Sequence, residues 1–126
     1  MAAVFFVAVI LPWLTQPKEV IPWRTDFAAA RQEARQANKP VFAYFTASWC
    51  GPCQHLKRTL WADPAAEAAL RAYVPVKIDI DANPTLAQQY NVDGIPNLMV
   101  LNDDGGVRKQ WTGALTTEAF SDWLKK

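Results

Sequence analysis

The sequence predicts an α/β fold in which helices cover both faces of a central mixed β-sheet. Apolar, strand-like stretches alternate with stretches of helical periodicity, and two more strand-like runs form a hairpin before a last helix. The alternation favours parallel strands, whereas the hairpin adds an antiparallel pair. The chain has 126 residues, 51% of them hydrophobic, which is enough to bury one core. We therefore expect a single globular domain.

The first seventeen residues form the only stretch with a membrane-like composition. They carry no charged side chain and are almost wholly apolar from Ala2 to Leu14. Fourteen helical residues reach about 21 Å, short of the roughly 30 Å hydrocarbon core, so a full span needs residues 15–17 or residues upstream. No convincing basic n-region or signal-peptide cleavage site is present. We expect residues 1–17 to be a membrane anchor or a truncated transmembrane helix, or alternatively a buried segment, and residues 18–126 to form the domain.

The first elements of the domain lead to the only two cysteines of the chain. Prolines make residues 15–23 a linker or a short edge strand. A helix follows over residues 25–39, with Thr25 or Asp26 as its N-cap. The apolar and aromatic run over residues 39–48 is typical of a strand buried on both faces. The inward stripe of the helix is predicted to be Phe27, Ala30, Ala34 and Ala37.

The remaining elements are marked by caps and turns. A helix over residues 54–61 follows the second cysteine, and Asp63-Pro64 and Asn83-Pro84 each give a cap with proline at the first helical position. The helices after these caps are predicted to run through Tyr73 and Tyr90, with a strand at residues 74–81 between them. Residues 95–111 read as two strands around an Asp-Gly-Gly turn, and residues 116–126 as a last helix.

The charge pattern excludes nucleic-acid binding as a function. Lys and Arg number 13 and Asp and Glu number 12, so the net charge is +1. No run of five or six like charges occurs, and therefore the chain lacks the basic patch that nucleic-acid binding requires.

Cys50 and Cys53 are the only cysteines and are predicted to form a redox-active pair. Residues three apart in a helical turn lie close enough for a disulfide to form and break with little backbone movement. Cys50 lies at a helix N-terminus, where free backbone N–H groups and the helix dipole favour a thiolate. We therefore expect Cys50 to be the nucleophile and Cys53, one turn further in, to be the resolving thiol.

Three other roles for the cysteine pair fit the sequence less well than redox chemistry: zinc binding, haem attachment and a purely structural disulfide. A zinc site needs four ligands, and only His55 and scattered carboxylates remain. Haem attachment needs a histidine directly after the second cysteine, where the chain has Gln54. A purely structural disulfide across so short a loop would remove little chain entropy. His55, the only histidine, is expected on a helix surface rather than as a catalytic base.

The stretch Trp49-Cys50-Gly51-Pro52-Cys53, after a buried strand and before a helix, resembles the active site of the thioredoxin family. Three later segments also resemble that family in the same order, so the resemblance covers residues 23–126. It implies a thioredoxin fold and a thiol-disulfide oxidoreductase with no cofactor besides the Cys50–Cys53 disulfide. Between the cysteines, Gly51 and Pro52 tune the redox potential. The three segments are residues 76–84, 94–101 and 112–120.

The resemblance also implies a substrate groove around the cysteines. Pro96 is expected to follow a cis peptide bond and to face the cysteine pair. The backbone of Ile95 would pair with an extended substrate, and Trp49 would cover the thiols as part of an apolar contact surface. Gly94 and Gly113 would line the same groove.

The chain departs from the thioredoxin pattern at Tyr44. Thioredoxins usually have a buried aspartate there, thought to help deprotonate the second thiol, whereas tyrosine is a poor base at neutral pH. Lys77 matches the lysine that accompanies the aspartate. We therefore predict that the Tyr44 hydroxyl and Lys77 replace the acid–lysine pair in proton transfer from Cys53.

The chain resembles extracytoplasmic relatives, in particular the C-terminal domain of the DsbD family of membrane electron transporters. Three features carry this resemblance: the tyrosine at position 44, the sequence of residues 39–53 around the cysteines, and the extra helix after Asp63-Pro64. This implies a monomeric domain in the periplasm, possible membrane attachment through the N-terminus, and reduction of protein disulfides with electrons from an upstream dithiol donor. The alternatives are an electron-relay domain of the DsbD type, a non-catalytic binding module of the same fold, and a cytoplasmic location.

Overall fold

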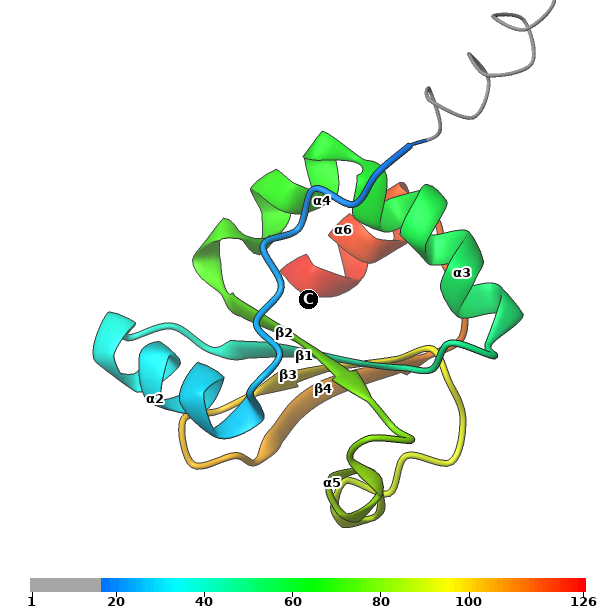
Figure 1. Ribbon diagram of the computed structural model, residues 1–126. Coiled ribbons are helices and arrows are strands. Elements are labelled where there is room, and N and C mark those ends of the chain that lie inside the picture. The colour runs from blue at the N-terminus through cyan, green and yellow to red at the C-terminus, as the bar shows by residue number, and fades with distance from the viewer. Residues whose placement is uncertain (1–16) are drawn as a thin grey trace, which may run out of the picture.

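The computed structural model describes residues 17–126, and their elements follow the predicted order (Figure 1). The elements are α2 (Phe27–Ala37), β1 (Val41–Thr46), α3 (Gly51–Arg58), η1 (Leu60–Ala62), α4 (Pro64–Ala69), η2 (Leu70–Ala72), β2 (Val74–Asp79), α5 (Pro84–Gln89), β3 (Asn97–Leu101), β4 (Val107–Thr112) and α6 (Thr117–Lys125). The short helices η1 and η2 are of the 3₁₀ type and extend α3 and α4.

The sheet is mixed, as the sequence predicts, and its four strands lie side by side in the order β2-β1-β3-β4. β1 pairs in parallel with β2, whereas β1 with β3 and β3 with β4 are antiparallel. Helices α3, α4 and α6 lie on one side of the sheet, and α2 and α5 lie on the other (Figure 1). The chain therefore has the predicted α/β layers of a thioredoxin fold.

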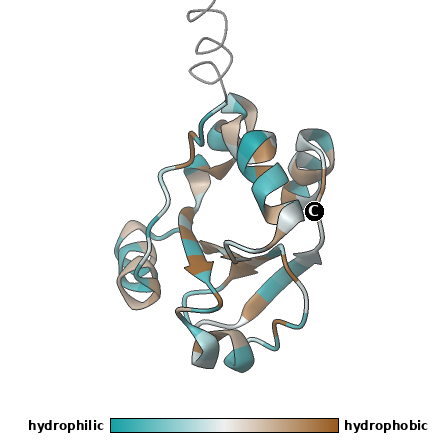
Figure 2. Ribbon diagram, turned by 45° about the vertical axis from the view of Figure 1, so that its right-hand side comes forward, coloured by the Kyte–Doolittle hydropathy of each residue, from teal (hydrophilic) through white to brown (hydrophobic). Residues whose placement is uncertain are grey.

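Strand β1 supplies side chains to the hydrophobic clusters on both faces of the sheet. Phe42 and Tyr44 pack with Trp61 and Phe120 on the side of α3 and α6. Val41, Ala43 and Phe45 point the other way, into the cluster beneath α2 and α5. Hydrophobic colour accordingly appears on strands of the sheet, although most of the polar strand β4 has hydrophilic colour (Figure 2). Burial on both faces explains the continuous apolar run in the sequence of β1.

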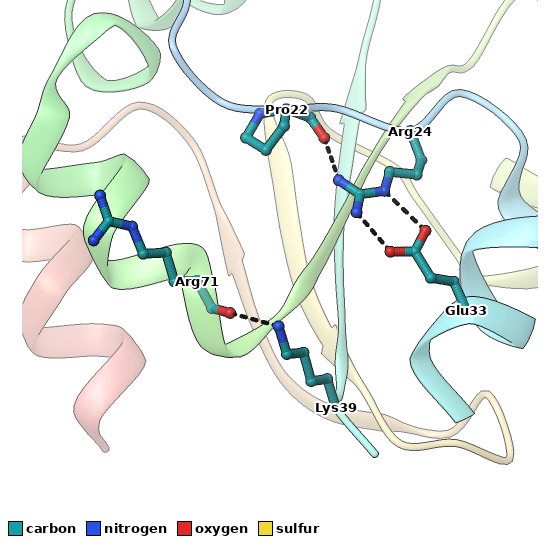
Figure 3. Close-up of polar contacts among 5 residues, drawn as sticks. All are labelled: Pro22, Arg24, Glu33, Lys39 and Arg71. Atoms are coloured by element: carbon teal, nitrogen blue, oxygen red, sulfur yellow. Dashed lines mark hydrogen bonds and ion pairs between the residues drawn. The ribbon is translucent and has the colours of Figure 1, made fainter. Parts of the chain in front are cut away.

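The segment before α2 runs beside the sheet edge and forms one isolated parallel bridge, between Arg24 and Val76. The backbone N–H of Arg24 donates to the Pro75 carbonyl at 2.9 Å, and the Lys77 N–H donates to the Arg24 carbonyl at 2.9 Å. The Arg24 guanidinium also binds the Glu33 carboxylate in two places (Figure 3). This agrees with the prediction of a linker or short edge strand for residues 15–23, as far as those residues are described.

The anchor predicted for residues 1–17 lies outside the described residues, apart from Pro17. Within residues 17–126, every helix is too short or too polar to cross a membrane.

The helix ends show where the sequence prediction was right and where it was not. Asp26 caps α2 through the Ala29 N–H, and Asp63 caps α4 through the Ala65 N–H, as predicted. Ala37 does not belong to the buried stripe of α2, because the helix ends there and leaves it exposed. The Asn83 side chain does not cap α5, since its amide donates instead to the Asp79 carbonyl at 3.0 Å.

Candidate active site

The two cysteines lie where β1 gives way to α3. Cys50 is the N-cap residue of α3, and its Sγ accepts the backbone N–H of Cys53 at 3.2 Å. The two residues are joined by a disulfide, with their Cα atoms 5.2 Å apart. Cys50 thus holds the helix N-terminal position predicted for it, where N–H groups stabilise negative charge on sulfur.

The surroundings of the pair are apolar and partly open. Cys50 and Cys53 are 4% and 3% exposed and pack with Ala47, Ile80 and Ile95. Gly51 and Pro52 are exposed next to them. Trp49 is 67% exposed, and its indole Nε1 donates to the Asp81 carboxylate at 2.9 Å. An approaching chain would therefore meet the Trp49 ring and exposed backbone around a buried disulfide.

The loop before β3 brings Ile95, one of the predicted groove residues, to the cysteines. The Ile95–Pro96 peptide bond is cis, which confirms that prediction, and the Ile95 side chain contacts the cysteine cluster. The Pro96 carbonyl accepts the Gly113 N–H at 2.8 Å, which ties this loop to the end of β4. Gly94 lies against Thr112, whose Cγ2 would be 3.1 Å from an added Cβ. The loop that carries Ile95 to the disulfide is thus held by the end of β4.

Tyr44 and Lys77 are neighbours across β1 and β2, but their side chains have different partners. Burial raises the pKa of Tyr44 above its ordinary value of 10.0, an effect that the side chains of Thr46 and Trp61 partly offset. Lys77 Nζ donates to both carboxylate oxygens of Glu19, at 2.8 and 2.9 Å. The structure therefore pairs Lys77 with a carboxylate and leaves Tyr44 as a buried neutral phenol.

Sequence reasoning missed two residues near the site, Glu19 and Asp81. Glu19 lies in a proline-rich segment without periodicity, 58 positions from its partner Lys77, so no local signal points to it. Asp81 ends the strand predicted at residues 74–81, and nothing in the sequence of that strand points to the hydrogen bond that its carboxylate accepts from the Trp49 indole. His55 is exposed on α3, as expected for a surface histidine.

The arrangement is suited to a two-step exchange of disulfides. One sulfur lies at the helix start with an N–H donor, and the second lies one turn inside with its Cα 5.2 Å away. A sulfur in the first position can take part in a mixed disulfide, and the second is near enough to displace it.

Comparison with known proteins finds relatives over most of the described residues. A family model described as a thioredoxin-like domain matches residues 27–126. A thioredoxin from Rhodospirillum rubrum is 34% identical over 98 residues, which cover 78% of this chain and 91% of that protein. Protein disulfide isomerase-like 1-4 from Arabidopsis thaliana is 39% identical over 89 residues, which cover 71% of this chain but only 14% of the plant protein.

Among solved structures, the oxidised C-terminal domain of DsbD from Neisseria meningitidis superposes with a TM-score of 0.70. The superposition covers 82% of this chain and 97% of that domain, at 24% sequence identity. At this level of identity the likeness concerns the fold.

Proposed function

This chain belongs to the thioredoxin-like family, and we propose that it is a thiol-disulfide oxidoreductase that reduces protein disulfides. The observation that carries the proposal is the position of Cys50 at the start of α3, where its sulfur accepts a hydrogen bond from the Cys53 N–H. The similarity to a thioredoxin over 91% of that protein's length supports the reducing direction.

In the proposed reaction the Cys50 thiolate attacks one sulfur of a substrate disulfide. A mixed disulfide forms, and the first substrate thiolate leaves and takes a proton from solvent. Cys53 then loses its proton and attacks Cys50 Sγ, which forms the Cys50–Cys53 disulfide and releases the second substrate thiolate. Two electrons pass from the cysteine pair to the substrate, and no other cofactor takes part.

The substrate is proposed to be an extended protein segment held by backbone contacts. The Ile95 side chain contacts the cysteine cluster, so a strand added alongside its backbone would place a disulfide beside Cys50. The exposed ring of Trp49 and the open backbone at Gly51 leave room for such a segment. An upstream dithiol protein would use the same surface to return electrons to the pair.

The redox potential of the cysteine pair tests the reducing direction. The protein is equilibrated with glutathione buffers, and the oxidised fraction is measured by thiol alkylation and mass spectrometry. We expect a potential close to that of thioredoxins, about −270 mV. A potential near that of protein disulfide isomerase, about −180 mV, would contradict a reducing role.

We also propose that the domain acts outside the cytoplasm as a monomer, attached to a membrane through residues 1–17. The support is the uncharged, apolar sequence of that segment. Separation of cells expressing the full chain into membrane and soluble fractions tests this placement. Recovery in the membrane fraction is expected, and release of the protein with the cytoplasmic fraction contradicts it.

A further inference from the structure

A small cavity lies behind the active site, with Cys53 in its wall. Its volume is about 190 Å³, room for several water molecules at roughly 30 Å³ each. The side chains that surround it come from the N-terminal segment, β1, α3 and β2. Besides Cys53, the titratable groups around the cavity are Glu19, Tyr44, Lys57, Lys77 and Asp79.

The resolving step needs a group that accepts the proton of Cys53. Burial disfavours the charged phenolate of Tyr44 and so raises the pKa of this group, which makes Tyr44 a poor acceptor. Lys77 donates to a carboxylate, and Lys57 is an exposed cation on α3. Since neither ammonium group has a free lone pair, only the two carboxylates of the cavity remain as acceptors.

Of the two carboxylates, Glu19 is the better placed. Its side chain is 17% exposed, and its oxygens accept Lys77 Nζ and the indole N–H of Trp23 at 3.0 Å. The Lys77 charge offsets that of the carboxylate, so no lone charge is buried. By contrast, Asp79 Oδ1 accepts the backbone N–H of Asp81 at 2.8 Å and closes the turn after β2.

The backbone holds Glu19 at the cavity although the segment is not a regular strand. The N–H of Val20 donates to the Trp61 carbonyl at 2.8 Å, and Ile21 is buried in the cluster beneath α3 and α6. Trp23 stacks on Phe42 and lies 5.4 Å from the Tyr44 ring. The residues that follow Glu19 are therefore fixed by a hydrogen bond and by packing, which holds Glu19 at the cavity.

We propose that Glu19 accepts the proton of Cys53 through cavity water, with Lys77 as the residue that positions its carboxylate. This inference rests on the proposed function. When Cys53 attacks Cys50 Sγ, the new S–S bond forms, the bond from Cys50 to the substrate breaks, and the substrate thiolate leaves with the electron pair. The Cys53 proton passes to water and then to Glu19, which later releases it to solvent.

The test follows the reaction of reduced protein with one equivalent of dithiobis(nitrobenzoate) by stopped-flow absorbance. The first nitrothiobenzoate is released when Cys50 attacks, and the second when Cys53 resolves the mixed disulfide. In Glu19→Gln we expect the first release to be unchanged and the second to be at least about tenfold slower near neutral pH. The difference should shrink at alkaline pH, where hydroxide takes the proton.

If Glu19 acted only through its charge, Glu19→Gln would change the rate of the second release in the opposite direction, so the test distinguishes the two roles. Removal of the Glu19 charge leaves Lys77 unpaired and favours the Cys53 thiolate, which would speed the second release. A faster or unchanged second release in Glu19→Gln therefore overturns the proposal. So does an equal slowing at every pH, which indicates a displaced segment. A wild-type protein without a second release overturns the two-step function itself.

Three further variants serve as controls. Glu33→Gln removes a half-exposed carboxylate of α2 that pairs with Arg24 and does not line the cavity, and both releases should stay as in wild type. Asp79→Asn should also leave the second release unchanged; if it gives the slowing and Glu19→Gln does not, Asp79 is the acceptor and the proposal is wrong. Glu19→Asp should restore part of the rate lost in Glu19→Gln.

Discussion

Gly113, a glycine of the expected groove, and Gly51, between the two cysteines, differ in the backbone conformation that each position requires. Gly113 has φ +107°, a conformation that residues with a Cβ rarely adopt, although the space around it is open. Gly51, the first residue of α3, likewise has open space for a Cβ and no positive φ. The constraint at Gly113 therefore comes from the backbone conformation alone.

We expect Gly113→Ala to lower the free energy of unfolding by about 1–3 kcal/mol, the usual cost of a strained backbone conformation. Gly51→Ala is the matched control and should change it by less than about 0.5 kcal/mol. Urea unfolding followed by circular dichroism measures both values. Equal effects of the two substitutions would contradict this account of Gly113.

At the residue scale the sequence predicted the cysteine pair better than it predicted the charged residues near it. Cys50 and Cys53 belong to a compact motif whose spacing places them, whereas the cis bond before Pro96 was expected only from the resemblance to the thioredoxin family. Glu19 reaches Lys77 only because the N-terminal segment folds back along the edge of β2. A contact across 58 positions depends on tertiary packing, so the ion pair between Glu19 and Lys77 could not be read from the sequence, which predicted only that Lys77 acts together with Tyr44.

At the scale of elements, Asp63 joins two helices on the same side of the sheet. Its carboxylate accepts the Ala65 N–H at 2.9 Å as the cap of α4 and the Thr117 hydroxyl at 2.8 Å from the first residue of α6. Both hydrogen bonds lower the pKa of Asp63 below its ordinary value of 3.8, and the bond from the Ala65 backbone has the larger effect. The ionised carboxylate is therefore the form that stabilises the fold.

The contribution of Asp63 should depend on pH in a defined direction. Because its folded pKa is lowered, its stabilisation is present above the ordinary pKa and is lost as pH falls through the folded value. We expect Asp63→Ala to melt at a lower temperature than wild type at neutral pH, with a difference that narrows below about pH 4. Thermal unfolding across pH measures this. Asp93→Ala, at an exposed loop carboxylate, should show no such pattern.

The order of elements was predictable because caps, prolines and periodicity act locally. Asp26 and Asp63 mark their helix starts, and the Asp-Gly-Gly turn marks the hairpin of β3 and β4. The end of α2 was harder to predict from the sequence. Asn38 adopts a left-handed conformation with φ 56° and stops the helix before the predicted end at residue 39. An asparagine at this position is compatible with either continuation or termination, so packing decides the boundary.

At the scale of the whole molecule, two hydrophobic layers cover the sheet and leave the cysteines just beyond the C-terminal end of the central strand β1. β1 lies centrally, with β2 and β3 as neighbours, and the chain emerges from its end directly into α3 (Figure 1). The loop with Ile95 and the segment with Glu19 approach the same pair, the first through the cysteine cluster and the second through the cavity behind Cys53. The fold thus gives Cys50 a route to a substrate and Cys53 a route for its proton.

The central claim is that Cys50 attacks a protein disulfide and Cys53 resolves the product. The most direct test incubates reduced Cys53→Ala with insulin and analyses the products by non-reducing electrophoresis and mass spectrometry. We predict a stable adduct linked through Cys50 that dithiothreitol releases, and no adduct for Cys50→Ala. Absence of an adduct with Cys53→Ala, or an equal adduct with Cys50→Ala, would contradict the account.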